Sequence, residues 1–207
     1  MSRMRYIVEN CGIVVLAAGA SSRMGNPKQL MKFKNKSFLQ NTIGATLQTG
    51  IRPVIVVVGA NKDLVEKEIM NPGIKVIRNL EWKKGMASSL RVGLSAAQKH
   101  HPYIDGIIFM VCDQPFVNSA LIDSLLNAQR ETGKPLVACS YGDRLGTPAL
   151  FHKSLFEELL QLKGDTGARG IIKKHEDLAS VIKFPEGIID IDTPEDWEAL
   201  HNEKVKS

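Results

Sequence analysis

Three apolar segments rich in β-branched residues set the strongest limit on how this chain folds. They are Gly12–Ala18, Arg52–Val58 and Gly106–Val111. Each is apolar at consecutive positions, which is typical of strands that are buried on both faces of a sheet. Between them lie segments whose apolar residues recur at the spacing of a helix, such as Phe38–Gln48. This alternation predicts a mostly parallel sheet with helices on both faces and right-handed crossovers.

The remaining segments extend the same pattern less regularly. Shorter strands are expected at Ile74–Ile77, Leu136–Cys139 and Thr147–Phe151, and helices at Ser88–Gln98, Ala120–Arg130 and Ser154–Gln161. Near the C-terminus, Leu178–Phe184 and Gly187–Ile191 predict an antiparallel pair. A last helix is expected to begin at Thr193, followed by Pro194 as its first residue. The predicted fold is therefore a three-layer α/β/α, Rossmann-like arrangement with a small antiparallel element near the C-terminus.

Length and composition narrow the class of protein. The 207 residues suffice for one domain, expected to span residues 1–207. The net charge of +5 suits anionic ligands, but aromatic residues make up only 6%, so platforms for stacking nucleic-acid bases are scarce. The three cysteines show no metal-binding spacing, and no apolar run suits a signal peptide or a membrane span. We expect a cytoplasmic protein that binds neither nucleic acid nor membrane.

A glycine-bracketed cationic loop, LAAGASSRMGNPK, follows the first strand at residues 16–28. It has neither the Gly-Lys-Ser/Thr ending of a Walker A loop nor the G-x-G-x-x-G fingerprint. Arg23 offers a planar fork for phosphate oxygens, and Lys28 a mobile positive charge. Gly25 permits the bend that returns Lys28 to the pocket. The residues expected to hold a nucleotide here are Leu16, Ala17, Ala18, Gly19, Ser21, Ser22, Arg23, Gly25 and Lys28. An ordinary loop with two solvated cations is the alternative.

Two carboxylate motifs follow apolar strands. Asp113 comes directly after Gly106–Val111 and Cys112, at the strand end where α/β proteins bind ligands. It is a candidate ligand of Mg²⁺, although an aspartate that caps a turn or a helix is the alternative. Asp190 and Asp192 alternate along a predicted strand, and Asp192 is the better candidate for a second ligand. The predicted metal ligands are therefore Asp113 and Asp192.

Five segments together resemble the MobA-like NTP transferase family. They are LAAGASSRMGNPKQL at residues 16–30, NLEWKKGMASSL at 79–90, GTPALF at 146–151, GDTGAR at 164–169 and DIDTPED at 190–196. They keep matching intervals over residues 12–200. The Ala-Ala-Gly and Ser-x-Arg-Met-Gly forms are more similar to the molybdenum cofactor cytidylyltransferase (MocA-like) branch than to the guanylyltransferase branch.

The resemblance implies a nucleotidyltransferase fold and a reaction. CMP would pass from CTP to molybdenum-loaded molybdopterin with release of pyrophosphate, and the product would go to a molybdoenzyme. Mg²⁺ is the implied cofactor, and the catalytic residues would be Arg23, Lys28, Asp113 and Asp192. Further nucleotide contacts would come from Asn79, Gly85 and Ser89, and acceptor contacts from Gln114, Pro148, Asp165 and Arg169.

Other functions stay open at this point. GTP in place of CTP would make the chain a guanylyltransferase acting on the same pterin. A sugar- or alcohol-phosphate nucleotidyltransferase shares the first loop and an acidic site. A nucleotide-binding cofactor chaperone or regulator would bind without turnover. Retention of both Asp113 and Asp192 favours an enzyme.

Overall fold

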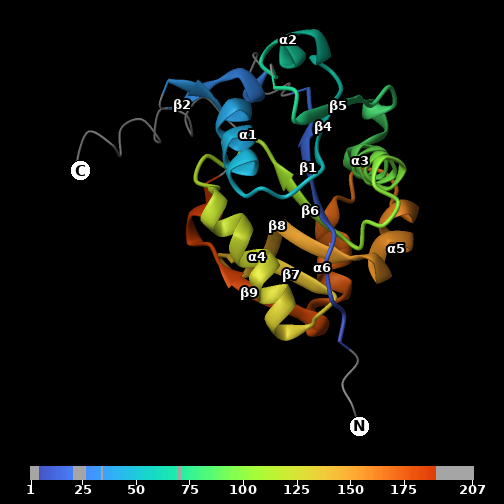
Figure 1. The fold of residues 1–207 in the computed structure, drawn as a ribbon. Helices are drawn as coiled ribbons and strands as arrows, with labels where there is room; N and C mark the ends of the chain where they lie inside the picture. Colours follow the sequence, from blue (N-terminus) through green and yellow to red (C-terminus); the bar gives the residue numbers. More distant parts are fainter. Residues whose placement is uncertain (1–4, 21–26, 34, 70, 190–207) are drawn as a thin grey trace, which may run out of the picture.

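A seven-stranded sheet forms the centre of the protein (Figure 1). The computed structural model describes residues 5–20, 27–33, 35–69 and 71–189. The strands run in the order β5-β4-β1-β6-β8-β7-β9. Their bounds are β1 Cys11–Ala17, β4 Val54–Val58, β5 Ile74–Arg78, β6 Gly106–Val111, β7 Leu136–Tyr141, β8 Arg144–His152 and β9 Ala179–Lys183.

All but one of these described strands point the same way. β1 pairs in parallel with β4 and β6, β4 pairs in parallel with β5, and β7 with β9. β8 is antiparallel to both of its neighbours, β6 and β7. The mostly parallel α/β fold expected from the sequence is confirmed.

The antiparallel part lies in a different place from the predicted C-terminal pair. Ala179–Lys183 joins β7 in parallel, and Pro185–Ile188 form a 3-10 helix, η5. β8 supplies antiparallel pairing within the main sheet. A separate small sheet pairs β2 (Lys32–Phe33) with β3 (Lys36–Ser37).

Helices cover both faces of the sheet (Figure 1). One face packs against α1 (Phe38–Gln48), α2 (Lys62–Lys67) and α4 (Ser119–Thr132). The other packs against α3 (Met86–His100), α5 (Phe156–Gln161) and α6 (Ala168–Lys174). Short 3-10 helices complete the elements: η1 Lys28–Leu30, η2 Trp82–Lys84, η3 Lys153–Leu155 and η4 Glu176–Leu178.

Strand periodicity explains why both faces are apolar. In β1, Ile13 and Val15 belong to the core under α1 and α4, whereas Val14 and Leu16 belong to the core under α3 and α5. Alternate residues of a strand point to opposite faces, so a strand covered on both sides needs apolar side chains throughout. Within the described ranges, the helices are too short or too polar to cross a membrane.

Strand direction also decides which loops meet. The carboxyl ends of β1, β4, β6 and β7 lie at one edge of the sheet. Because β8 is reversed, its amino end, which begins at Arg144, lies at that same edge. Loops from both halves of the chain therefore converge where α/β proteins bind their ligands.

Candidate nucleotide and acceptor clefts

Two adjoining clefts open at this edge of the sheet. The first, which we name the Lys28 cleft, has a volume of about 470 Å³ and is lined by Leu16, Ala18, Gly19, Ala20, Lys28, Gln29, Trp82, Lys83, Gly85, Met86, Ser89, Val111, Cys112, Asp113 and Asp165. The second, the Tyr141 cleft, has about 540 Å³. Its polar and charged lining includes Gln114, Tyr141, Arg144, Thr147, Thr166, Arg169 and Lys173. Asp113 and Asp165 line both clefts, so these two carboxylates lie on the shared wall.

A buried glutamine holds Lys28 beside the end of β1. The Gln29 amide nitrogen donates to the carbonyl oxygen of Ala17 at 3.3 Å and to that of Gly19 at 2.9 Å. These bonds tie η1 to the residues that directly follow β1. The Lys28 Nζ atom then lies 3.7 Å from Asp113 Oδ2, with both side chains largely shielded from solvent. The structure thus brings together a cation and a carboxylate that are far apart in the sequence.

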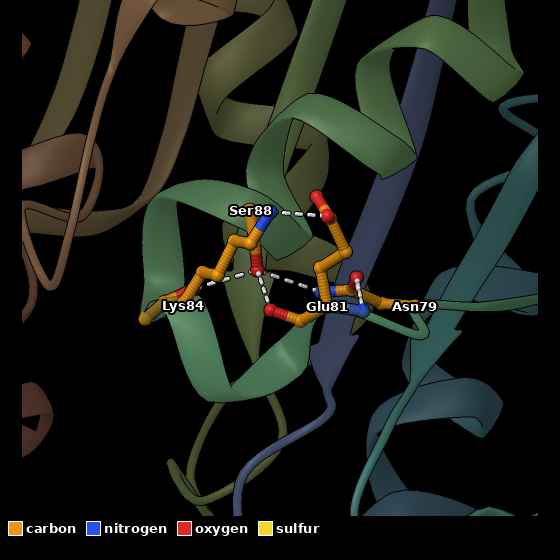
Figure 2. A network of polar contacts seen from close by, with 5 residues as sticks. Asn79, Glu81, Lys84 and Ser88 are labelled. Atoms are coloured by element: carbon orange, nitrogen blue, oxygen red, sulfur yellow. Dashed lines mark hydrogen bonds and ion pairs between the residues drawn. The ribbon is translucent and has the colours of Figure 1, made fainter.

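A polar network joins the loop after β5 to the start of α3, beside the Lys28 cleft, and Figure 2 shows its hydrogen bonds. The buried Asn79 amide nitrogen donates to Ser88 Oγ at 2.8 Å and to Ser89 Oγ at 2.9 Å. Asn79 Oδ1 accepts from the Glu81 backbone at 2.9 Å. Both hydrogens of the amide are therefore taken by serines in the first turn of α3, and Asn79 does not line the cleft. Ser89, which Asn79 holds, does line it.

Gly85 allows the loops of the two clefts to approach each other. Its φ of +94° lies in the region that favours glycine, and a Cβ atom there would lie 2.4 Å from the Gly164 carbonyl oxygen. The Ala87 backbone N–H donates to that same Gly164 oxygen at 3.1 Å. This contact holds Asp165 against the start of α3, which explains how Asp165 reaches the shared wall.

The Tyr141 cleft gathers three polar side chains from distant segments. Gln114 is buried, and its Oε1 atom has no hydrogen-bond partner among the described residues. Burial raises the pKa of Tyr141, while the neighbouring Arg169 and Gln114 side chains oppose part of that rise. The phenol is therefore protonated at neutral pH. Within the described chain, no ion pair joins Arg169 to Asp165.

Several predicted residues fall elsewhere. Ser21, Ser22, Arg23, Gly25 and Asp192 lie outside the described residues. Pro148 is buried in β8 and does not line the Tyr141 cleft, although its neighbours Gly146 and Thr147 do. Ala17 contributes its carbonyl oxygen to Gln29 rather than a wall of the cleft.

The sequence reasoning missed two residues, Gln29 and Tyr141. Gln29 follows Lys28 directly, so its position beside a charged loop residue was the available signal. Tyr141 ends a strand, as Asp113 follows one, but no motif marks it.

The described residues offer no reactive thiol, but they do offer a carboxylate that could hold a metal ion. Burial raises the pKa of Cys112 far above its usual range and that of Cys11 and Cys139 to about 12, so none of these thiols serves as a ready nucleophile. No group of three or more potential metal-binding side chains occurs in the described part of the chain. Asp113 nevertheless fits a Mg²⁺ ion, because this ion is commonly held by one or two carboxylates together with substrate phosphates.

A larger hollow of about 730 Å³ lies away from these clefts. Residues Asn10, Thr49, Arg52, His100 and Arg130 help to line it. None of the predicted site residues is among its lining.

The fold and the site define a class of protein. A mostly parallel sheet carries a cation and a carboxylate at its carboxyl edge, with small residues beside them, which is the arrangement of nucleotide-binding α/β proteins. The chain belongs to the MobA-like NTP transferase domain family, which matches residues 13–178. The protein is accordingly a nucleotidyltransferase in family and fold.

Known proteins are similar over most of the chain. Nicotine blue oxidoreductase of Paenarthrobacter nicotinovorans is 29% identical, over 90% of this chain and 94% of that protein. Molybdenum cofactor cytidylyltransferase of Escherichia coli is 23% identical, over 89% and 92%. The crystal structure of Rv0371c from Mycobacterium tuberculosis is 29% identical with a TM-score of 0.78, covering 93% of this chain and 98% of that one. A second structure of Rv0371c is a complex with manganese, at 28% identity, a TM-score of 0.71 and coverage of 92% and 97%.

Proposed function

We propose that this protein transfers CMP from CTP to the phosphate of molybdenum-loaded molybdopterin. Pyrophosphate is released, and the finished dinucleotide cofactor passes to a molybdoenzyme. The observation that supports this most is the Lys28–Asp113 pair, 3.7 Å apart on the boundary of two clefts. A transferase needs room for two substrates that meet at one reacting phosphate, and two adjoining clefts supply it.

The reaction needs no strong general base. An oxygen of the acceptor phosphate attacks the α-phosphorus of the nucleotide, a new P–O bond forms, and the bond to the β-phosphate oxygen breaks. The electron pair of that bond leaves with pyrophosphate. Because the attacking oxygen is already anionic, catalysis consists of positioning and charge stabilisation.

In this proposal the Lys28 cleft binds the nucleotide. Ala18 and Gly19 leave room for the base and ribose, and Ser89 offers a hydroxyl group. Lys28 stabilises negative charge on the phosphates. Arg23, Ser21, Ser22 and Gly25 are proposed to act on the same phosphates. Asn79 acts indirectly, because it holds Ser89 in place.

The Tyr141 cleft binds the acceptor. Gln114 and Arg169 both line this cleft, and Asp165 marks its boundary with the Lys28 cleft. Arg169 supplies positive charge for an anionic acceptor. Pro148 is proposed to act only indirectly, because it is buried in β8 next to Thr147, which lines the cleft.

A divalent cation completes the proposed site. Asp113 is the described residue that would hold it, with Asp192 as the second proposed ligand. When bound, Mg²⁺ would supply positive charge to the reacting phosphate oxygens. The manganese complex of Rv0371c is consistent with a divalent ion in this family.

CTP is proposed on the form of the first loop, Ala17-Ala18-Gly19. GTP with the same pterin, or another phosphorylated acceptor such as a sugar or alcohol phosphate, would use the same chemistry. These choices change the base and acceptor while leaving the roles of Lys28 and Asp113 intact.

An oxidoreductase is the second candidate, because the nicotine blue oxidoreductase matches 90% of this chain. A redox function predicts oxidation of a reduced nicotinamide without pyrophosphate release. A chaperone or regulator predicts tight nucleotide binding with neither reaction. The loop after β1 favours transfer, because it lacks the dinucleotide fingerprint G-x-G-x-x-G.

The test is a pyrophosphate-release assay with each of the four nucleoside triphosphates, Mg²⁺ and molybdenum-loaded molybdopterin. CTP is expected to give pyrophosphate only when the acceptor is present. A response to GTP alone would replace cytidylyl with guanylyl transfer. Absence of pyrophosphate with all four nucleotides, together with oxidation of NADH or NADPH, would contradict the transferase.

A further inference from the structure

The Tyr141 side chain is held by its neighbours at the wall of the Tyr141 cleft. Tyr141 is the last residue of β7 and lines the second cleft but not the first. Its ring packs edge-on against Phe184, with centroids 6.5 Å apart and ring planes at 89°. The aromatic ring is therefore fixed by packing, while the hydroxyl group reaches the wall of the cleft.

Two glycines clear the space that the phenol occupies. A Cβ atom at Gly146 would lie 2.0 Å from the Tyr141 hydroxyl oxygen, and one at Gly187 would lie 2.7 Å from its Cδ1 atom. Neither glycine has a positive φ, so the space and not the backbone conformation requires glycine here. Both glycines also line the Tyr141 cleft.

The surroundings of the hydroxyl give it a direction. The Gln114 amide nitrogen donates to the Gly187 carbonyl oxygen at 3.4 Å. The Arg169 guanidinium, which neighbours the phenol, can only donate hydrogen bonds. The phenol donates no hydrogen bond to a described residue, so its hydrogen is left for an oxygen or nitrogen acceptor atom on a bound molecule in the cleft that it lines.

We propose that Tyr141 selects the acceptor substrate, by donating a hydrogen bond to a part of the molecule that lies beyond the reacting phosphate. This inference rests on the proposed transferase function. The reacting phosphate belongs at Asp113 on the shared wall, whereas Tyr141 lines only the second cleft. The acceptor class is therefore a phosphate ester that carries a hydrogen-bond-accepting group away from its phosphate.

The test compares Tyr141→Phe with the wild type in the pyrophosphate-release assay. The substitution removes only the hydroxyl and keeps the ring against Phe184. The KM for the acceptor is expected to rise roughly tenfold, as for loss of one hydrogen bond in a largely buried site. The KM for CTP and the kcat at saturating acceptor are expected to stay within about twofold. Tyr103→Phe, the same change at a side chain that is 88% exposed, is the matched control and should change nothing.

Gly146→Ala supplies an independent test, because its methyl group would displace the hydroxyl without removing it. It should raise the KM for the acceptor at least as much as Tyr141→Phe, with the KM for CTP unchanged. An unchanged acceptor KM in an active Tyr141→Phe enzyme, or an equal rise in both KM values, would overturn the role of Tyr141. Inactivity of the wild type with every nucleotide would instead overturn the proposed function.

Discussion

The Lys28 cleft and the Tyr141 cleft share a wall but are built in different ways. The Lys28 cleft begins with a short stretch of sequence after β1, and main-chain carbonyls at Ala17 and Gly19 fix its cation through Gln29. The Tyr141 cleft depends on the reversed strand β8 and on residues as far apart in the sequence as Gln114 and Gly187. A loop that binds a common cosubstrate can be local, whereas a cleft for a particular acceptor draws on many segments.

The largest effect is expected where the two clefts meet. Asp113→Ala removes the carboxylate from the shared wall and should lower kcat for transfer by about 100- to 1,000-fold, as for loss of one group that stabilises reacting charge. Steady-state pyrophosphate release measures it. Asp177→Asn, at an exposed carboxylate in η4, is the control and should keep full activity. Wild-type turnover by Asp113→Ala would remove Asp113 from the site.

A second change is expected to affect the nucleotide side selectively. Lys28→Met removes a charge-assisted contact and should lower kcat/KM for CTP by about 10- to 100-fold. The KM for the acceptor should stay within about twofold. Lys153→Met alters an exposed lysine in η3 and should leave both constants unchanged. If Lys28→Met instead changed only the acceptor KM, the assignment of the two clefts would be reversed.

The opposite selectivity is expected on the acceptor side. Arg169→Ala removes one of the two cations that α6 contributes to the Tyr141 cleft and should raise the KM for the acceptor roughly tenfold. The KM for CTP should hold, since Arg169 lines only the Tyr141 cleft. Isothermal titration with CTP and with the acceptor separately would measure this split. Equal weakening of both ligands would mean that the clefts are not independent.

The smallest effect concerns the helix that carries Arg169. Glu158 in α5 contacts Lys174 at 2.6 Å and His175 at 3.0 Å, and hydrogen bonds from these two side chains lower the pKa of Glu158 below 4.5. The stabilisation that the charged Glu158 gives to the fold is therefore fully present above the ordinary glutamate pKa. It is lost as the pH falls through the lowered pKa of the folded state. Because Lys174 is exposed, Glu158→Gln should cost only about 0.5 kcal/mol at pH 7.

Urea unfolding at pH 7 and pH 3 checks this prediction. The difference in unfolding free energy between the wild type and Glu158→Gln should shrink towards zero at pH 3. A difference that grew as the pH fell would contradict the lowered pKa.

The sequence predicted the parallel half of the sheet well. Expected and observed bounds coincide for Gly106–Val111 and for Phe38–Gln48. Doubly covered strands and an amphipathic helix carry their pattern locally, so no distant contact is needed to recognise them. Asp113 was predicted because it follows a strand end, and Lys28 because it is a cation in the glycine-bracketed loop after the first strand.

The other half of the sheet, and the side chains of the clefts, could not be predicted in the same detail. The apolar run that contains Val181 is compatible with either strand direction, and only its pairing with β7 makes it parallel. The sequence alone allows the Asn79 amide to contact the edge of a nucleotide base. In the fold, its nitrogen instead donates to two nearby serine hydroxyl groups. Tyr141 acquires its role from Gly146 and Gly187, whose closeness exists only in the folded chain.

The most direct test is a crystal structure with a non-hydrolysable CTP analogue and Mn²⁺. The account predicts the base and ribose in the Lys28 cleft near Ala18 and Ser89, and the α-phosphate beside Asp113. An anomalous manganese peak should lie against the Asp113 carboxylate, with the Tyr141 cleft still free for the acceptor. A nucleotide bound in the Tyr141 cleft, or a metal ion remote from Asp113, would contradict it.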